Sequence, residues 1–235
     1  MNGGAARPPQ PLLCQCGDCN KPVVRGQTFC GFHRQNGCPI KSPLSGAEPD
    51  YVPEEYNNDK AIQYSHNCLS YAMGVRDQNK IKACRDENKC GFHVPGKKMG
   101  HPDFSNQMRK TCGDVIARTM ADVPNAYLID FSSQCKPGFS KIGTVVDEDN
   151  DFHYYRQDSN GWWSHKPGGR AVTNKDATGA AIYNPQRASR YYKAEYKGDN
   201  ELNYDKACPF MCVPRDGSIQ LTGGKRRGGK TRRRT

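Results

Sequence analysis

The stretch Asp151-Phe-His-Tyr-Tyr-Arg-Gln-Asp-Ser-Asn-Gly-Trp162 decides how this chain folds. Within it, Phe152–Arg156 is rich in aromatic residues and predicts a strand, and Ser159-Asn-Gly161 predicts a turn into a second strand, Trp162–His165. Upstream, Lys141-Ile-Gly-Thr-Val-Val146 is rich in β-branched residues and predicts a further strand. We therefore expect a three-stranded antiparallel meander.

Two histidines of this meander are candidates for acid–base chemistry. Alternate residues of a strand share a face, so His153 lies with Tyr155, while Phe152 and Tyr154 face the other way. His165, on the adjoining strand, can lie beside His153 and orient its ring. The alternative is that both histidines are structural, which is the commoner role of a histidine in a strand.

The candidate nucleophile lies upstream, in Ser65-His-Asn-Cys68. Ser65 predicts a helix N-cap, and the residues from His66 to Val75 predict the helix that follows. Cys68 then lies in the first turn, where the partial positive charge of the helix end stabilises a thiolate. The alternative is a buried and unreactive cysteine, the commoner fate of this residue type.

A second helix is predicted over Cys112–Asp122, because Pro124 stops any continuation. The chain thus changes from helical to strand patterns near its middle. A helix-borne cysteine followed by an antiparallel sheet predicts an α+β domain.

The N-terminal cysteines have the spacing of a metal site. Two close ligand pairs, Cys-x2-Cys and Cys-x2-His, are separated by a ten-residue loop, which lets four ligands converge on one tetrahedral zinc ion. The ligands expected from this spacing are Cys16, Cys19, Cys30 and His33. Cys14 and Cys38 flank the motif and can replace one ligand or pair with each other. The alternative is a loop stapled by disulfides without metal.

The chain has twelve cysteines, and the zinc motif and Cys68 account for four of them. The others are Cys14, Cys38, Cys84, Cys90, Cys112, Cys135, Cys208 and Cys212. Cys84 and Cys90, and Cys208 and Cys212, can bridge locally or across the domain. Sequence alone does not fix disulfide connectivity.

Composition divides the chain into five parts. Residues 1–13 are rich in glycine and proline and are expected to be disordered, 14–38 form the zinc module, and 39–58 are a proline-rich connector without a regular helix. The main α+β domain spans 59–216, and 217–235 is a disordered basic tail.

The formal charge of +11 is concentrated in that tail. The last eleven residues carry seven positive charges and no acid, which leaves +4 for the rest of the chain. The charged residues are Lys225, Arg226, Arg227, Lys230, Arg232, Arg233 and Arg234. We expect this tail to bind polyanions such as viral DNA or an anionic membrane without sequence preference, or to serve as a solubilising or nuclear-targeting end.

No stretch of the sequence has the roughly 20 apolar residues of a membrane span, and the first residues lack the apolar core of a signal peptide. The expected location is therefore the cytoplasm of the cell that makes the protein, without secretion.

Several long motifs together resemble an uncharacterised protein family of giant, nucleocytoplasmic large DNA viruses. The resemblance spans about 29–215 and rests on Phe29-Cys-Gly-Phe-His33, Ser42 to Tyr51, Ser65 to Met73, Asp151 to Gly168, Val172 to Asp176, Tyr183-Asn-Pro185 and Cys212-Val-Pro-Arg215. It implies a location in the virion, or in the host cytoplasm or viral factory during assembly, with other virion or capsid proteins as partners. Such viruses typically encode a thiol oxidase, which permits disulfides without secretion.

The order of the candidate residues is similar, more distantly, to NlpC-type and other papain-like cysteine peptidases. This similarity implies Cys68 as nucleophile, His153 as base and His165 as orienting residue. Asp176 or Asn174 can replace His165 in that role, and the Asn67 side chain or the Cys68 backbone N–H can contribute to an oxyanion hole. The glycine that commonly precedes the family's histidine is absent, and Asp151-Phe152 stands in its place.

The sequence therefore predicts a papain-like α+β domain with a small zinc module. The expected function is hydrolysis of an amide or isopeptide bond in a protein or peptide substrate, by an enzyme that can be packaged in the virion. The alternative is a non-catalytic minor capsid or virion structural protein, stabilised by zinc and disulfides, in which Cys68 serves only the fold.

Overall fold

The computed structural model describes residues 10–104, 108–193 and 201–222. The expected basic tail from 223 onward and the first nine residues of the expected N-terminal segment lie outside the described residues.

An antiparallel sheet forms the centre of the molecule, in the order β1-β8-β2-β3-β4, with β7 paired to the far end of β2. β8 is the last of these strands along the chain, yet it lies between β1 and β2. A separate pair is formed by β5 (Tyr191–Tyr192) and β6 (Leu202–Asn203). The strands of the main sheet are β1 (Tyr127–Ile129), β2 (Phe139–Asp147), β3 (Asp151–Gln157), β4 (Trp163–His165), β7 (Lys206–Ala207) and β8 (Phe210–Pro214).

The predicted meander is confirmed as β2-β3-β4. In its register Val145 pairs with His153, and Tyr155 pairs with His165. The predicted alternation also holds, because Phe152 and Tyr154 pack in one apolar cluster and Tyr155 in another. The two faces of β3 therefore pack into different apolar clusters.

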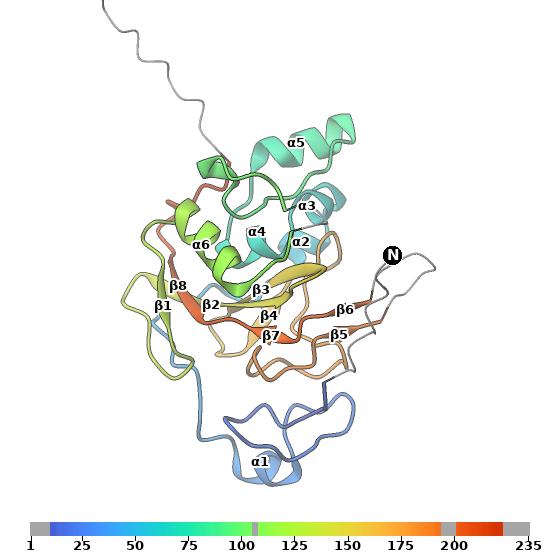
Figure 1. Cartoon of the computed structure of the whole chain (residues 1–235), viewed down its shortest axis with the longest axis vertical. Coiled ribbons are helices and arrows are strands. Elements are labelled where there is room, and N and C mark those ends of the chain that lie inside the picture. The colour runs from blue at the N-terminus through green and yellow to red at the C-terminus, as the bar shows by residue number, and fades with distance from the viewer. Residues whose placement is uncertain (1–9, 105–107, 194–200, 223–235) are drawn as a thin grey trace, which may run out of the picture.

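The helices α2 to α6 gather on one side of the sheet, and α1 lies at the far end of the molecule (Figure 1). α4 and α6 pack on β2, β3 and β8, where Leu69, Val115 and Met211 belong to one continuous core. The elements are α1 (Gly31–Asn36), α2 (Glu54–Asn57), α3 (Lys60–Ser65), α4 (Cys68–Met73), α5 (Gln78–Glu87), the 3₁₀ helix η1 (Lys97–Met99) and α6 (Cys112–Asp122).

The predicted helix over Cys112–Asp122 is confirmed at both ends. The Thr111 hydroxyl caps its first turn by accepting from the Asp114 N–H, and the helix ends before Pro124. Val115 is fully buried against the sheet.

The helix predicted over 66–75 is shorter, and its N-cap is Asn67 rather than Ser65. Ser65 ends α3, and its hydroxyl donates to the Ala61 carbonyl one turn earlier. The Asn67 side chain accepts from the Ser70 N–H, which begins α4 at Cys68. At the other end, Gly74 adopts a left-handed conformation with φ 71° and closes the helix.

Two details of the expected organisation differ in the structure. The connector 39–58 contains α2, which forms because Tyr56 buries its ring against the α3 and α4 region. The packed part of the chain extends past residue 216, since Leu221 lies buried in the main core.

Four disulfides fix the connectivity that the sequence left open. Cys84 pairs locally with Cys90 after α5. Cys208 and Cys212 do not pair with each other. Cys208 pairs with Cys112 at the start of α6, and Cys212 pairs with Cys135 in the segment after β1. The pairs are Cys16–Cys38, Cys84–Cys90, Cys112–Cys208 and Cys135–Cys212.

The N-terminal module packs on the segment that follows β4. The Gln15 side chain accepts from the Tyr183 and Asn184 N–H groups and donates to Asp176. Arg187 donates to the Cys14 and Cys19 carbonyls. The module is thus anchored by buried polar contacts.

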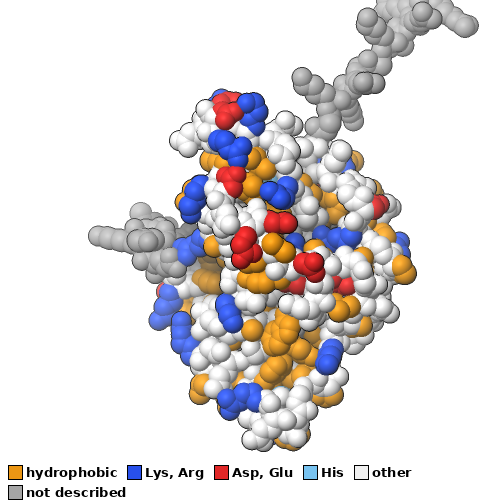
Figure 2. Space-filling model, turned by 180° about the vertical axis from the view of Figure 1, so that it is seen from behind, with side chains coloured by type: hydrophobic (Ala, Val, Ile, Leu, Met, Phe, Trp, Pro, Cys, Tyr) orange, Lys and Arg blue, Asp and Glu red, His pale blue; other side chains and the backbone are white. Residues whose placement is uncertain are grey.

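Acidic and basic side chains are interspersed on the face shown in Figure 2, where the described residues form no continuous basic surface. None of the helices in the described ranges has the length and apolar character that crossing a bilayer requires.

Candidate functional site

Cys68 is the first residue of α4, and its side chain is 5% exposed. The sequence prediction that it lies in the first turn of a helix is confirmed. Cys68 packs against β3, in the same apolar cluster as Phe152 and Tyr154.

His153 and His165 lie side by side on β3 and β4. His153 Nε2 and His165 Nδ1 are 2.7 Å apart, and both rings are buried. The structure therefore brings together the two histidines that the sequence singled out.

The hydrogen-bond partners determine which ring nitrogens carry protons. His165 Nε2 lies 2.9 Å from the Lys175 carbonyl, which can only accept, so this nitrogen carries the proton of a neutral His165. His165 Nδ1 is then an acceptor, and His153 donates to it through Nε2. His153 Nδ1 is left with the lone pair of a general base.

Cys68 and His153 line the same cavity, which has a volume of about 320 Å³. The start of α4, β3 and the loop after β4 form most of the wall, and Leu202 of β6 and Tyr204 complete it. Its lining includes Asn67, Cys68, Asp151, His153, Gly168 and Tyr204. The two candidates thus line one cavity, but from different faces of β3: Cys68 packs with Phe152 and Tyr154, whereas His153 packs with Tyr155 and Tyr204. Among the described residues no hydrogen bond joins the Cys68 sulfur to either histidine.

Both candidates are neutral at rest. Burial raises the pKa of Cys68 to about 12, and the Asp151 carboxyl adds to this effect. Burial lowers the pKa of His153 well below its ordinary value, with a further contribution from His165. A reaction through the Cys68 thiolate would therefore require proton transfer at the moment of attack, because the thiolate is not present beforehand.

Lys166 shapes one wall of this cavity. Its ammonium is fully buried and donates to the carbonyls of Gln63, Gly168 and Arg170. Burial lowers its pKa to about 8. These bonds tie the loop after β4 to α3, a role that the sequence did not indicate.

The structure does not support the other expected site residues. The Asn67 side chain is held by the cap of α4: its amide nitrogen donates to the His93 carbonyl and its oxygen accepts from Ser70. Asp176 accepts from several backbone N–H groups of its own loop, and Asn174 pairs with Ile182 through its backbone. Of the three candidates for the orienting role, His165 is the one that hydrogen-bonds to His153.

A second buried network lies behind Cys68 and was missed by the sequence analysis. Asp77 Oδ2 lies 3.3 Å from His93 Nε2, and His93 Nδ1 lies 2.8 Å from the Ser70 hydroxyl. Ser70 also contacts Asn67, the cap of α4. Ser70 is fully buried, so this network positions the start of the helix and presents no nucleophile to solvent.

The buried histidines predict a loss of stability in mild acid. Burial lowers the pKa of His66, His93 and His165 to about 4, against an ordinary value of 6.5. Between these values the unfolded chain binds protons that the folded chain does not, so the free energy of unfolding falls as the pH falls from about 6.5 to about 4. Each such histidine removes on the order of 2 kcal/mol by about pH 5.

Denaturant unfolding at about pH 7 and pH 5 measures this effect. His93→Gln should reduce the difference between the two conditions, whereas the same change at the exposed His101 should leave it unaltered. An identical pH difference in the His93→Gln variant and the wild type would contradict the prediction.

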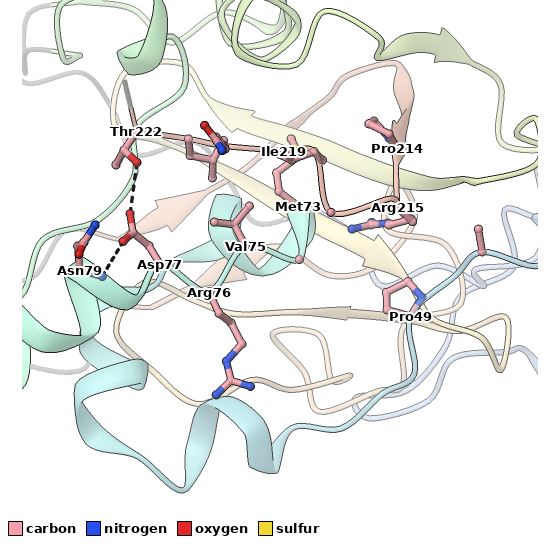
Figure 3. Close-up of a pocket in the computed structure, with 15 residues that line it drawn as sticks. Pro49, Met73, Val75, Arg76, Asp77, Asn79, Pro214, Arg215, Ile219 and Thr222 are labelled. Carbon is pink, nitrogen blue, oxygen red and sulfur yellow. Dashed lines mark hydrogen bonds between the residues drawn. The ribbon is translucent and has the colours of Figure 1, made fainter. Parts of the chain in front are cut away.

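A larger cavity, of about 870 Å³, lies at the opposite end of α4 (Figure 3). Its charged groups already have structural partners: Asp77 accepts from Asn79 and Thr222, and Arg215 donates to Ser140 and Ala72. It is lined by neither Cys68 nor a candidate histidine. We therefore place the candidate reaction in the smaller cavity.

The N-terminal module contains a compact cluster of metal-ligating atoms from Cys14, Cys19, Cys30 and His33, all within 4.8 Å of one another. His33 Nδ1 lies 3.3 Å from the Cys14 sulfur and 3.5 Å from the Cys30 sulfur. The edges of a tetrahedral zinc site with these ligand types are roughly 3.3–3.8 Å. The residues present therefore fit such an ion.

Cys16 was expected as a ligand, and this was wrong. Its Cα lies 5.5 Å from that of Cys38, within bridging range, and the two form a disulfide. Cys14 takes the fourth ligand position. The hydrogen bond from the His33 backbone N–H lowers the pKa of Cys30 to about 7, which favours the thiolate that a metal binds.

Comparison with known proteins gives one distant similarity to report. Over 149 residues the chain is 29% identical to "Insoluble matrix shell protein 1" of Ruditapes philippinarum, which covers 63% of this chain and 86% of that protein. No family model matches the chain. No solved structure matches it.

Proposed function

We propose that this protein is a papain-like cysteine hydrolase that cleaves an amide or isopeptide bond. Cys68 is the nucleophile, His153 the general base and His165 the residue that orients it. The proposal rests on one observation: the Lys175 carbonyl and His165 fix His153 in the tautomer that a base requires, and His153 opens on the cavity that Cys68 lines.

The reaction follows from this arrangement. The Cys68 thiol transfers its proton to His153 Nδ1 as its sulfur attacks the substrate carbonyl. We expect the Cys68 backbone N–H, at the start of α4, to donate to the oxyanion that forms. His153 then protonates the leaving amine, and a water molecule hydrolyses the thioester with His153 again acting as base.

The metal supports this site from a distance. We propose zinc, because three thiolates and one imidazole in a tetrahedral arrangement suit that ion best. The module that it holds packs on the segment carrying Lys175: Thr28 donates to the Ala181 carbonyl, and Ala181 pairs with Lys175. The metal thus stabilises the strand segment that orients His165.

A structural protein is the second candidate function. Four disulfides and a buried, protonated Cys68 are what a durable, non-catalytic protein requires. Similarity to a protein named for an insoluble shell matrix supports the same view. From the sequence resemblance to giant-virus proteins we propose the virion as the place of either function, with capsid proteins as partners and the basic tail as a polyanion-binding segment.

A peptide chloromethyl ketone, which alkylates a cysteine only after a substrate-like approach, separates the two functions. The hydrolase should be alkylated at Cys68 at neutral pH, and His153→Ala should slow the reaction by about 10²-fold or more. His101→Ala is the matched control. Protein that is intact and folded, yet not alkylated at Cys68 by any peptide of a small library, would support the structural function.

A further inference from the structure

The cavity beside Cys68 is mostly apolar and contains a single acidic side chain. Phe152, Leu202 and the loop Pro167-Gly168-Gly169 supply apolar wall. Arg170 also lines it, but this side chain is exposed, so solvent screens its charge. Asp151 is partly buried and belongs to β3, two residues before His153.

The Asp151 carboxylate has hydrogen bonds, and the charge of the buried Lys110 lowers its pKa from a distance, but no direct ion pair of Asp151 lies among the described residues. The Tyr204 hydroxyl donates to Oδ2 at 2.7 Å, and the Phe152 backbone N–H also contributes. Within the described ranges, no lysine, arginine or histidine nitrogen lies within 4.0 Å of it. Burial is the largest influence on Asp151 and raises its pKa. The ionised carboxylate is therefore incompletely stabilised in the free protein.

This carboxyl also acts on the nucleophile. Apart from burial, the charge of Asp151 is the largest cause that raises the pKa of Cys68. A carboxylate beside a nucleophile that must become a thiolate is unfavourable unless something neutralises it during the reaction. A cation delivered with the substrate removes this unfavourable charge, and the apolar wall strengthens its attraction to the carboxylate.

We propose that Asp151 determines substrate specificity by binding a protonated amine, so that the substrate is a peptide or amide with an alkylammonium group close to the scissile carbonyl. This inference rests on the proposed function of Cys68. Two exposed rings, Tyr64 and Phe92, lie beside Gly169 at the cavity wall and offer an apolar surface to the stem of such a group. The positive charge of the substrate thereby favours formation of the Cys68 thiolate that attacks it.

The ammonium can belong to a lysine side chain or to a free N-terminus, and three chloromethyl ketone probes distinguish these sources. One carries lysine with a blocked α-amine, one norleucine with a free α-amine, and one norleucine with a blocked α-amine. The rate constants for alkylation of Cys68 in the full chain are measured by mass spectrometry. One of the cationic probes should react about 10–100-fold faster than the neutral probe, the gain expected from a charge-assisted hydrogen bond.

Asp151→Asn should bring this ratio close to one by slowing the cationic probe, while the neutral probe reacts at least as fast as before. Asn retains an acceptor for the Tyr204 hydroxyl, which protects the fold. Asp149→Asn is the control, because Asp149 precedes β3 in the same turn, is largely exposed and does not line the cavity.

The outcomes separate the two proposals. If all three probes alkylate Cys68 of the wild type at equal rates, the hydrolase proposal stands and the role of Asp151 is wrong. If the preference exists but survives Asp151→Asn, the cation binds elsewhere and the inference fails. If no probe alkylates Cys68 of the wild type, both proposals fail together. This outcome is measured on the wild type alone, so it does not depend on whether the Asp151→Asn variant folds.

Discussion

Replacement of Cys68 with alanine should reduce amide hydrolysis by about 10⁴-fold or more, down to what binding alone provides. His153→Ala should have an effect of similar size, because among the described residues His153 is the one histidine that lines the cavity. His165→Ala frees His153 to adopt the opposite tautomer and should lower kcat more than it raises KM. Hydrolysis of a substrate found by library screening measures all three.

His101→Ala, a histidine change outside the cavity, should leave the rate unaltered. The Cys68→Ala and His153→Ala double variant should be no slower than either single variant, since the two residues act as one unit. Full activity in Cys68→Ala would show that another group performs the attack.

Removal of the metal should unfold the N-terminal module. A segment this short relies on its ligands, and zinc binding contributes about 10 kcal/mol or more to the folding of comparable small modules. Cys14→Ser should therefore lose bound zinc and expose residues 14–38 to proteolysis. Elemental analysis should find about one zinc ion per wild-type chain.

The paired change Cys16→Ser with Cys38→Ser provides the matched control for this prediction. It removes two cysteines of the same module and breaks their disulfide, but it leaves the ligand cluster complete. It should retain zinc. Loss of zinc from this variant with retention in Cys14→Ser would restore Cys16 as the ligand and contradict the observed cluster.

The parts of this molecule that the sequence predicted depend on local rules. Strand alternation placed His153 and Tyr155 together, and the position of a helix start placed Cys68 in the first turn, because both follow from the backbone geometry of a few neighbouring residues. The ligand Cys14 was not distinguished from Cys16, since both precede Cys19 at a spacing that a zinc site tolerates. Only the position of Cys38 in space decides between them.

Contacts between distant segments escaped prediction for the same reason. Asp77, His93 and Ser70 come from three separate segments, and nothing in their sequence spacing indicates that they meet. From the sequence, Lys166 is expected to be an ordinary surface lysine, but in the structure its ammonium donates to three carbonyls. Such groups become visible only when the tertiary structure shows where a buried charge finds its partners.

The central place of β8 has a consequence for how the chain reaches its native state. β8 inserts between β1 and β2 although it is made after every other strand of the sheet, so these two strands have no direct pairing to hold them during synthesis. β2 can pair with β3 as soon as both are made, but β1 joins the sheet only through residues 210–214. The contacts that complete the sheet therefore span large sequence separations, which slows folding. Both long-range disulfides end at Cys208 and Cys212, beside or within this strand. These two disulfides therefore form late, and they covalently secure the part of the sheet that only the complete domain can assemble.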